Sequence, residues 1–159
     1  MLMSNLIGEM AANLEFVDTA GKTKALYEVN APYTFVIFWD PNCGHCKEEI
    51  PRIDSIYRAS WEKKGVKIYA VLSEGEKLKS EWLTFIRDKK IGDWVHVYQT
   101  KTMIDEEVKN QRPTFRQLYN VEVTPTMYLL DKDKRIIGKK LTIEQMNDLL
   151  DVKIKNGDK

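Results

Sequence analysis

The apolar positions of this chain follow two kinds of pattern. Residues 33–39 form an unbroken apolar run, which predicts a buried strand. The apolar positions after them repeat at helical spacing and predict a helix over 43–63, which Pro51 should kink and Gly65 should end. Residues 66–72 are rich in apolar and β-branched side chains. They predict a second, parallel strand, which completes a β–α–β unit.

The rest of the chain continues as short strands and helices. Alternating residues on either side of the Gly21–Lys22 turn predict an N-terminal β-hairpin within residues 8–30. The later elements are predicted as a helix over 78–89, a strand over 94–98, a short helix over 114–119, strands over 126–130 and 135–138, and a last helix over 143–152 capped by Thr142.

Two segments carry polar residues with no assigned chemistry. Residues 99–111 are polar and acidic and predict a loop or an insertion, with Asp105, Glu106 and Glu107 on a solvated face. His96 alternates with apolar residues in the strand over 94–98, so we expect an exposed histidine without a functional role.

Length and composition predict one globular domain. The 159 residues are 43% hydrophobic and 31% charged, and the formal net charge is +1. That balance offers no electrostatic argument for binding nucleic acid or a membrane surface, and no apolar run reaches the ~18 residues of a membrane span. We expect a single domain over 1–159, with its core at about 8–152 and a disordered tail over 153–159.

The N-terminal residues do not have the features of a secretory signal. Residues 1–10 lack both a basic start and a long apolar core. Two interpretations stay open: a cytoplasmic protein, or the C-terminal part of a longer precursor.

The only two cysteines, Cys43 and Cys46, stand at the junction of the strand over 33–39 and the helix after it. A Cys-x-x-Cys pair in this setting is typical of a redox site. Cys43 should lie at the N-terminus of the helix, where the helix dipole favours the reactive thiolate. Cys46, one turn further in, should be the buried resolving thiol. A partly cationic His45 between them would further favour the reduced form and make the pair more oxidising.

Other uses of the cysteine pair fit less well. A structural zinc site needs four ligands, and only His96 lies outside the motif as a further soft ligand, so we expect no metal. Covalent haem attachment needs a histidine directly after the second cysteine, where Lys47 stands. A structural disulfide over so short a loop would hardly restrict the unfolded chain.

The segment around the cysteines resembles the thioredoxin superfamily. Trp39 precedes the motif, and Cys43-Gly44-His45-Cys46 has the four residues found in protein disulfide isomerases. Glu49, followed closely by Pro51, resembles the TlpA/ResA-like thiol–disulfide oxidoreductases. The fold that this resemblance implies is α/β and thioredoxin-like, with a mixed central β-sheet, helices on both faces and an N-terminal β-hairpin.

The resemblance also implies roles for residues outside the cysteine pair. Thr124–Pro125, directly before a predicted strand, should be a cis peptide bond that faces the cysteines and pairs with an extended substrate. Glu49 should accept the proton of Cys46. A second interpretation is that Glu48 and Glu49 only complement the helix dipole.

The function implied by the resemblance is thiol–disulfide exchange with protein substrates and an upstream redox partner. It needs no cofactor beyond the Cys43–Cys46 dithiol, and we expect a monomer outside the cytoplasm. The alternatives are a redox-sensing or substrate-binding module and a peroxide-linked cytoplasmic reductase. Asp40 stands where peroxiredoxins have a threonine, which argues against peroxidase chemistry.

Overall fold

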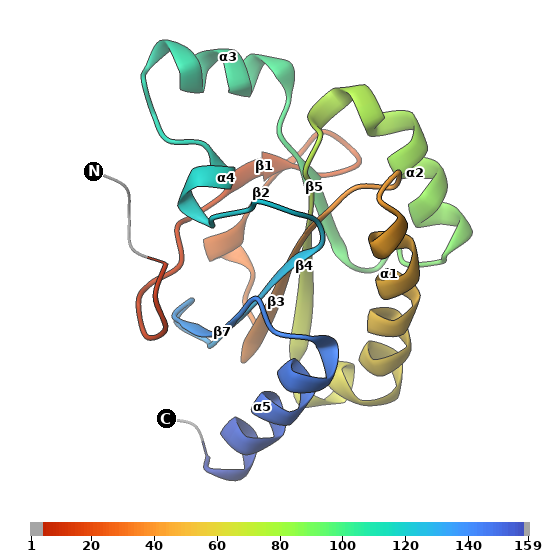
Figure 1. The fold of residues 1–159 in the computed structure, drawn as a ribbon, viewed down its shortest axis with the longest axis vertical. Helices are drawn as coiled ribbons and strands as arrows, with labels where there is room; N and C mark the ends of the chain where they lie inside the picture. The colour runs from red at the N-terminus through yellow and green to blue at the C-terminus, as the bar shows by residue number, and fades with distance from the viewer. Residues whose placement is uncertain (1–4, 158–159) are drawn as a thin grey trace.

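The fold is an α/β arrangement built on one mixed sheet (Figure 1). The structure is a computed structural model, and it describes residues 5–157. Its strands are β1 (Glu15–Val17), β2 (Thr23–Ala25), β3 (Tyr33–Trp39), β4 (Val66–Leu72), β5 (Val95–Tyr98), β6 (Thr126–Leu130) and β7 (Ile136–Lys139). Its α-helices are α1 (Gly44–Ile56), α2 (Lys79–Asp88), α3 (Lys101–Lys109), α4 (Phe115–Leu118) and α5 (Ile143–Lys155). Shorter helical segments are η1 (Leu26–Glu28), η2 (Tyr57–Trp61, a π-helix), η3 (Glu62–Lys64) and η4 (Gly75–Leu78).

The strand that leads into the cysteine pair lies inside the sheet. The strand order is β2-β1-β5-β4-β3-β6-β7. β3 pairs in parallel with β4 along its whole length, from Tyr33↔Val66 to Trp39↔Leu72, and antiparallel with β6. A strand with neighbours on both sides and helices over both faces is enclosed, and every residue of β3 is buried, including the polar Thr34.

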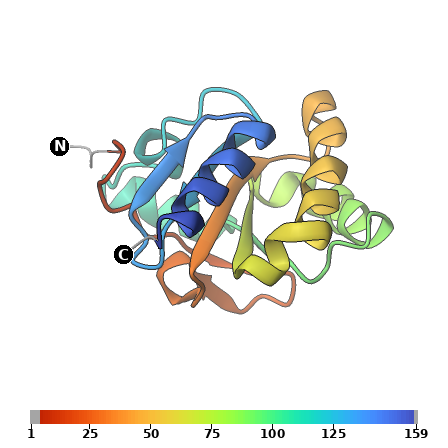
Figure 2. The same ribbon diagram turned by 90° about the horizontal axis from the view of Figure 1, so that it is seen from below.

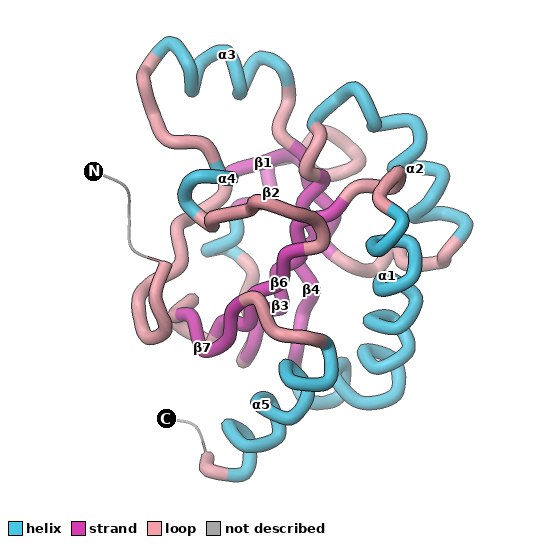
Figure 3. The backbone as a smooth tube through the Cα atoms, viewed as in Figure 1, coloured by secondary structure: helices cyan, strands magenta, loops and turns pink. Residues whose placement is uncertain are grey.

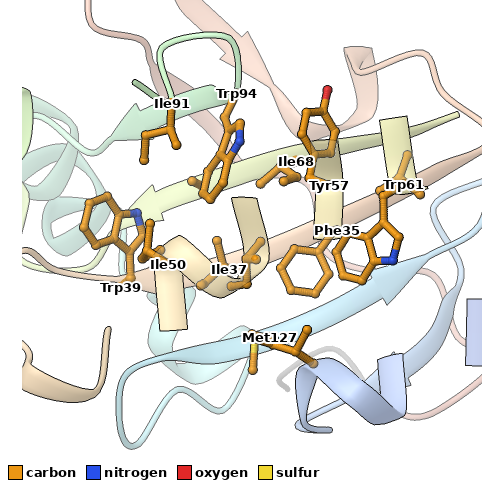
Figure 4. Close-up of a cluster of buried hydrophobic side chains, with 14 of the residues drawn as sticks. Phe35, Ile37, Trp39, Ile50, Tyr57, Trp61, Ile68, Ile91, Trp94 and Met127 are labelled. Atoms are coloured by element: carbon orange, nitrogen blue, oxygen red, sulfur yellow. The ribbon is translucent and has the colours of Figure 1, made fainter. Parts of the chain in front are cut away.

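Helices cover both faces of this sheet. One face packs against α1, α2 and α5, and the other against α4, η1 and the N-terminal segment (Figure 2). Figure 4 shows the first core, in which the rings of Phe35 and Trp61 lie with their centroids 4.9 Å apart. The predicted mixed sheet with helices on both faces is therefore confirmed.

The segment from α1 to β4 forms the expected β–α–β connection. Helical backbone continues from α1 through η2 and η3, so the whole run ends at Lys64, close to the predicted end. Pro51 lies inside α1. Gly65 ends the run with a φ of +85°, a left-handed conformation that glycine adopts without strain.

The N-terminal hairpin is present and belongs to the main sheet. β1 and β2 pair antiparallel, and β1 also pairs with β5 at Val17↔Tyr98. The Asp18 carboxylate accepts hydrogen bonds from the backbone N–H groups of Ala20 and Lys22, which closes the turn.

The prediction of a loop over 99–111 is wrong, because the segment contains α3. Thr100 caps the helix by accepting a hydrogen bond from the Met103 N–H at 3.1 Å, and Lys101 pairs with Asp105 one turn later at 3.2 Å. These local contacts stabilise a helix whose polar composition had indicated a loop.

Two further predictions need correction. His96 is buried, with 3% of its surface exposed, because α2 covers its strand and places it beside the rings of Trp82 and Trp94. The disordered tail was predicted from residue 153, but α5 continues to Lys155. The last turn of this helix carries basic residues, which the helix dipole favours at that end. Residues 158–159 lie outside the described residues. Within residues 5–157, no helix has both the length and the apolar character that crossing a bilayer requires.

Candidate active site

Cys43 lies at the first turn of α1, where β3 leads into the helix. It is the N-cap residue, with an extended backbone (φ −80°, ψ 117°), and its Sγ accepts a hydrogen bond from the Cys46 backbone N–H at 3.1 Å. The first N–H groups of a helix have no partner within the helix, and here one of them is directed at the sulfur. Cys43 thus lies at the N-terminus of a helix, where the sequence placed it.

Cys46 lies behind Cys43 and has no exposed surface. Both cysteines are free thiols. The pKa of the Cys46 thiol is raised from 9.0 to about 12, first by burial and then by the contact with Cys43. The two sulfurs therefore differ: one is half-buried at a helix end, and the other is enclosed and protonated at neutral pH.

The second half of the site comes from the loop before β6. The Thr124–Pro125 peptide bond is cis, and the Cys43 thiol donates a hydrogen bond to the Thr124 carbonyl at 3.4 Å. Figure 3 shows this loop running from α4 towards the N-terminal end of α1 before β6 begins. Residues 81 positions apart in the chain thus meet at one sulfur.

Hollows in the surface flank this meeting point. One, of about 340 Å³, is lined by residues on both sides of Thr124, including Val123 and Pro125, and by Leu141. Another, of about 420 Å³, is lined by Asn42 next to Cys43 and by residues of α2. An extended chain crossing Cys43 would have room for side chains on either side.

The exposed side of α1 carries a row of ion pairs. Glu49 contacts His45 Nε2 through Oε1 at 3.5 Å and Arg52 Nη1 through Oε2 at 2.9 Å. Arg52 also contacts Glu144 in the first turn of α5. The spacing of His45, Glu49 and Arg52 on one helix would have indicated this row, but Glu144 comes from a distant element and gave no such signal.

Other residues of the motif have structural surroundings. Trp39 is fully buried, and its ring lies 5.1 Å from that of Phe85, so it belongs to the core beneath the site. The Asp40 carboxylate accepts the Asn42 N–H at 2.8 Å and closes the turn before Cys43. Gly44 opens α1, and a Cβ built on it would have no atom within 4 Å. The Asp40 backbone also reaches the Cys46 thiol, and this hydrogen bond lowers the pKa of that thiol against the effect of burial.

Comparison with known proteins places this arrangement among thiol–disulfide oxidoreductases. Residues 7–139 match the AhpC/TSA family. Among curated proteins, the chain is similar to the thiol-disulfide oxidoreductase ResA of Bacillus cereus, with 27% identity over 135 residues that cover 84% of this chain and 68% of ResA.

Solved structures give the same result. A domain of a possible thiol-disulfide isomerase from Cytophaga hutchinsonii shares 37% identity, with a TM-score of 0.79 and 95% of each chain covered. The thioredoxin domain of a thiol-disulfide oxidoreductase from Bacteroides vulgatus shares 26% identity, with a TM-score of 0.73, and the match covers 96% of this chain and 98% of that one.

Proposed function

This chain belongs to the AhpC/TSA family, and from that membership and the geometry of its thiols we propose that it is a ResA-like thiol–disulfide oxidoreductase of the thioredoxin superfamily, with Cys43 attacking and Cys46 resolving. The observation that carries the assignment of roles is the contrast between the two sulfurs. Cys43 caps a helix beside a cis-proline loop, and Cys46 is enclosed behind it.

The reaction follows from that contrast. The Cys43 thiolate attacks one sulfur of a substrate disulfide, and the other substrate sulfur leaves as a thiolate. Cys46 then loses its proton and attacks Cys43 Sγ, which releases the second substrate thiol and leaves a Cys43–Cys46 disulfide. Two electrons pass from the dithiol to the substrate, and an upstream thiol partner returns them; the same steps in reverse oxidise a substrate.

Substrate would bind where the helix tip meets the cis-proline loop. The Thr124 carbonyl already accepts a hydrogen bond from the Cys43 thiol, so a substrate lying along Thr124 and Pro125 brings its sulfur to Cys43.

We expect protein thiols and disulfides as substrates, with no cofactor beyond the dithiol. We also propose that the chain is one domain, that it acts as a monomer, and that it functions outside the cytoplasm. Cell fractionation with an antibody against the protein would test the location.

The direct test is reduction of insulin disulfides in the presence of dithiothreitol. We expect turnover by the wild type and none by Cys43→Ser. Cys46→Ser should accumulate a mixed disulfide with substrate, visible by mass spectrometry, because nothing resolves it. Equal turnover by the wild type and Cys43→Ser would refute the assignment.

Peroxide reduction is the second candidate, because the N-terminal hairpin of β1 and β2 resembles the opening of peroxiredoxins as well as that of TlpA-like oxidoreductases. Against it, the Asp40 carboxylate is occupied by the Asn42 N–H. Consumption of hydrogen peroxide that depends on Cys43 and exceeds the rate of insulin reduction would favour this candidate over disulfide exchange.

A further inference from the structure

The carboxylate of Glu49 is held between the His45 imidazole and the Arg52 guanidinium. One oxygen contacts His45 and the other contacts Arg52, while Arg52 is itself bound by Glu144 from the start of α5. α1 and α5 lie on the same face of the sheet (Figure 2). Only 15% of the Glu49 side chain is exposed, whereas 69% of the His45 side chain is, so Glu49 is the more buried partner of this pair.

These contacts do not direct Glu49 at Cys46. The pKa of Cys46 is raised first by burial and then by its contact with Cys43, and hydrogen bonds with the Asp40 backbone and with Thr124 act against both. One oxygen of Glu49 contacts His45, which stands within the Cys-x-x-Cys motif itself, and the other contacts Arg52.

We propose that Glu49 is a positioning residue for His45, held in place by Arg52, and that it raises the reduction potential of the Cys43–Cys46 pair through the imidazole instead of taking the proton of Cys46. The proposal rests on the proposed function. The charged groups that contact Glu49 and His45 come from two elements. Arg52 on α1 contacts Glu49, and Glu144 on α5 contacts Arg52.

The direction of the effect follows from charge. The Glu49 carboxylate holds the His45 ring beside the motif, and a positive charge on that ring would stabilise the Cys43 thiolate, which exists only in the reduced protein. Removing the Glu49 charge should therefore make the pair more reducing. An exposed ion pair is weak, so we expect about a threefold change in the equilibrium constant, which is ~14 mV for a two-electron couple.

The test is a double-mutant cycle on the reduction potential. In the equilibrium, two glutathione thiols reduce the Cys43–Cys46 disulfide and become one glutathione disulfide. Potentials are measured for the wild type, Glu49→Gln, His45→Ala and the double variant. We expect Glu49→Gln to lower the potential in the wild type and to change it little once His45 is absent.

Two variants sharpen the cycle. Glu48→Gln removes the same charge from the neighbouring exposed position, and we expect a clearly smaller shift than for Glu49→Gln. Arg52→Gln should lower the potential only when His45 is present. A Glu49→Gln or Arg52→Gln shift that persists in His45→Ala, or an equal shift from Glu48→Gln, overturns the assignment.

The outcomes also separate this proposal from the one before it. A wild type that exchanges no disulfides with glutathione overturns the proposed function and this assignment together. A wild type that exchanges normally, with Glu49→Gln slowing the resolution step whether or not His45 is present, overturns the assignment alone and returns Glu49 to the role of proton acceptor.

Discussion

The burial of Cys46 makes a quantitative prediction about thiol reactivity. The perturbation is Cys43→Ser, which leaves Cys46 as the single cysteine. A rise in pKa from 9.0 to about 12 lowers the thiolate fraction at pH 8 about a thousandfold relative to an ordinary cysteine. Burial is the largest cause of that rise and stays when Cys43 is replaced, and an enclosed sulfur also excludes the reagent.

The assay is alkylation by iodoacetamide at pH 8, followed by intact-mass spectrometry. For the folded Cys43→Ser variant, which lacks the contribution of Cys43 to that pKa, we expect a rate at least ~100-fold below that of the same chain in guanidinium chloride. The matched control is Cys46→Ser, whose remaining Cys43 is half-buried at the helix tip and should be protected far less by folding.

One result would refute the reasoning. If folded Cys43→Ser, with native circular dichroism, is alkylated within tenfold of its unfolded rate, then Cys46 is neither enclosed nor held protonated. The division into an attacking and a resolving thiol would then lose its physical basis.

Three further predictions concern stability. Burial lowers the pKa of His96 from 6.5 to about 4, so the folded state binds a proton at His96 less tightly than the unfolded state does. The contribution of neutral His96 to the free energy of unfolding is fully present above pH 6.5 and is lost as the pH falls towards 4. Urea unfolding of the wild type and of His96→Gln should show this loss, of up to about 3 kcal/mol, in the wild type alone. Gly65→Ala should destabilise the protein by about 1–3 kcal/mol, since its φ is +85° and the new Cβ would lie 2.7 Å from Pro32, whereas Gly44→Ala should be nearly neutral; equal midpoints of thermal unfolding would contradict this. Thr100→Ala should cost about 1 kcal/mol through the lost α3 cap, measurable as faster amide hydrogen exchange in α3, and unchanged exchange would mean that the cap does not stabilise the helix.

The sequence by itself determined most of the local structure and the position of the two cysteines within it. The apolar run of β3, the helical spacing after it and the glycine at its end are short-range signals, and each appears in the structure where the sequence placed it. The position of Cys43 at a helix N-terminus follows from the same neighbours, because the strand, turn and helix are contiguous in the chain.

Tertiary structure decided the surroundings of those groups. The alternation of polar and apolar residues predicted an exposed His96, but α2 packs over this strand and buries it. Alternation within a strand does not specify which other element will cover it. The partner of Glu49 was uncertain for the same reason, since one end of its ion-pair row comes from Glu144, 95 residues further along. Even the contact between Cys43 and Thr124 exists only because the sheet places β6 next to β3. Local sequence patterns specify the helices and strands and the residues that each of them carries. Burial and charge pairing, in contrast, arise from packing between segments that are distant in the chain.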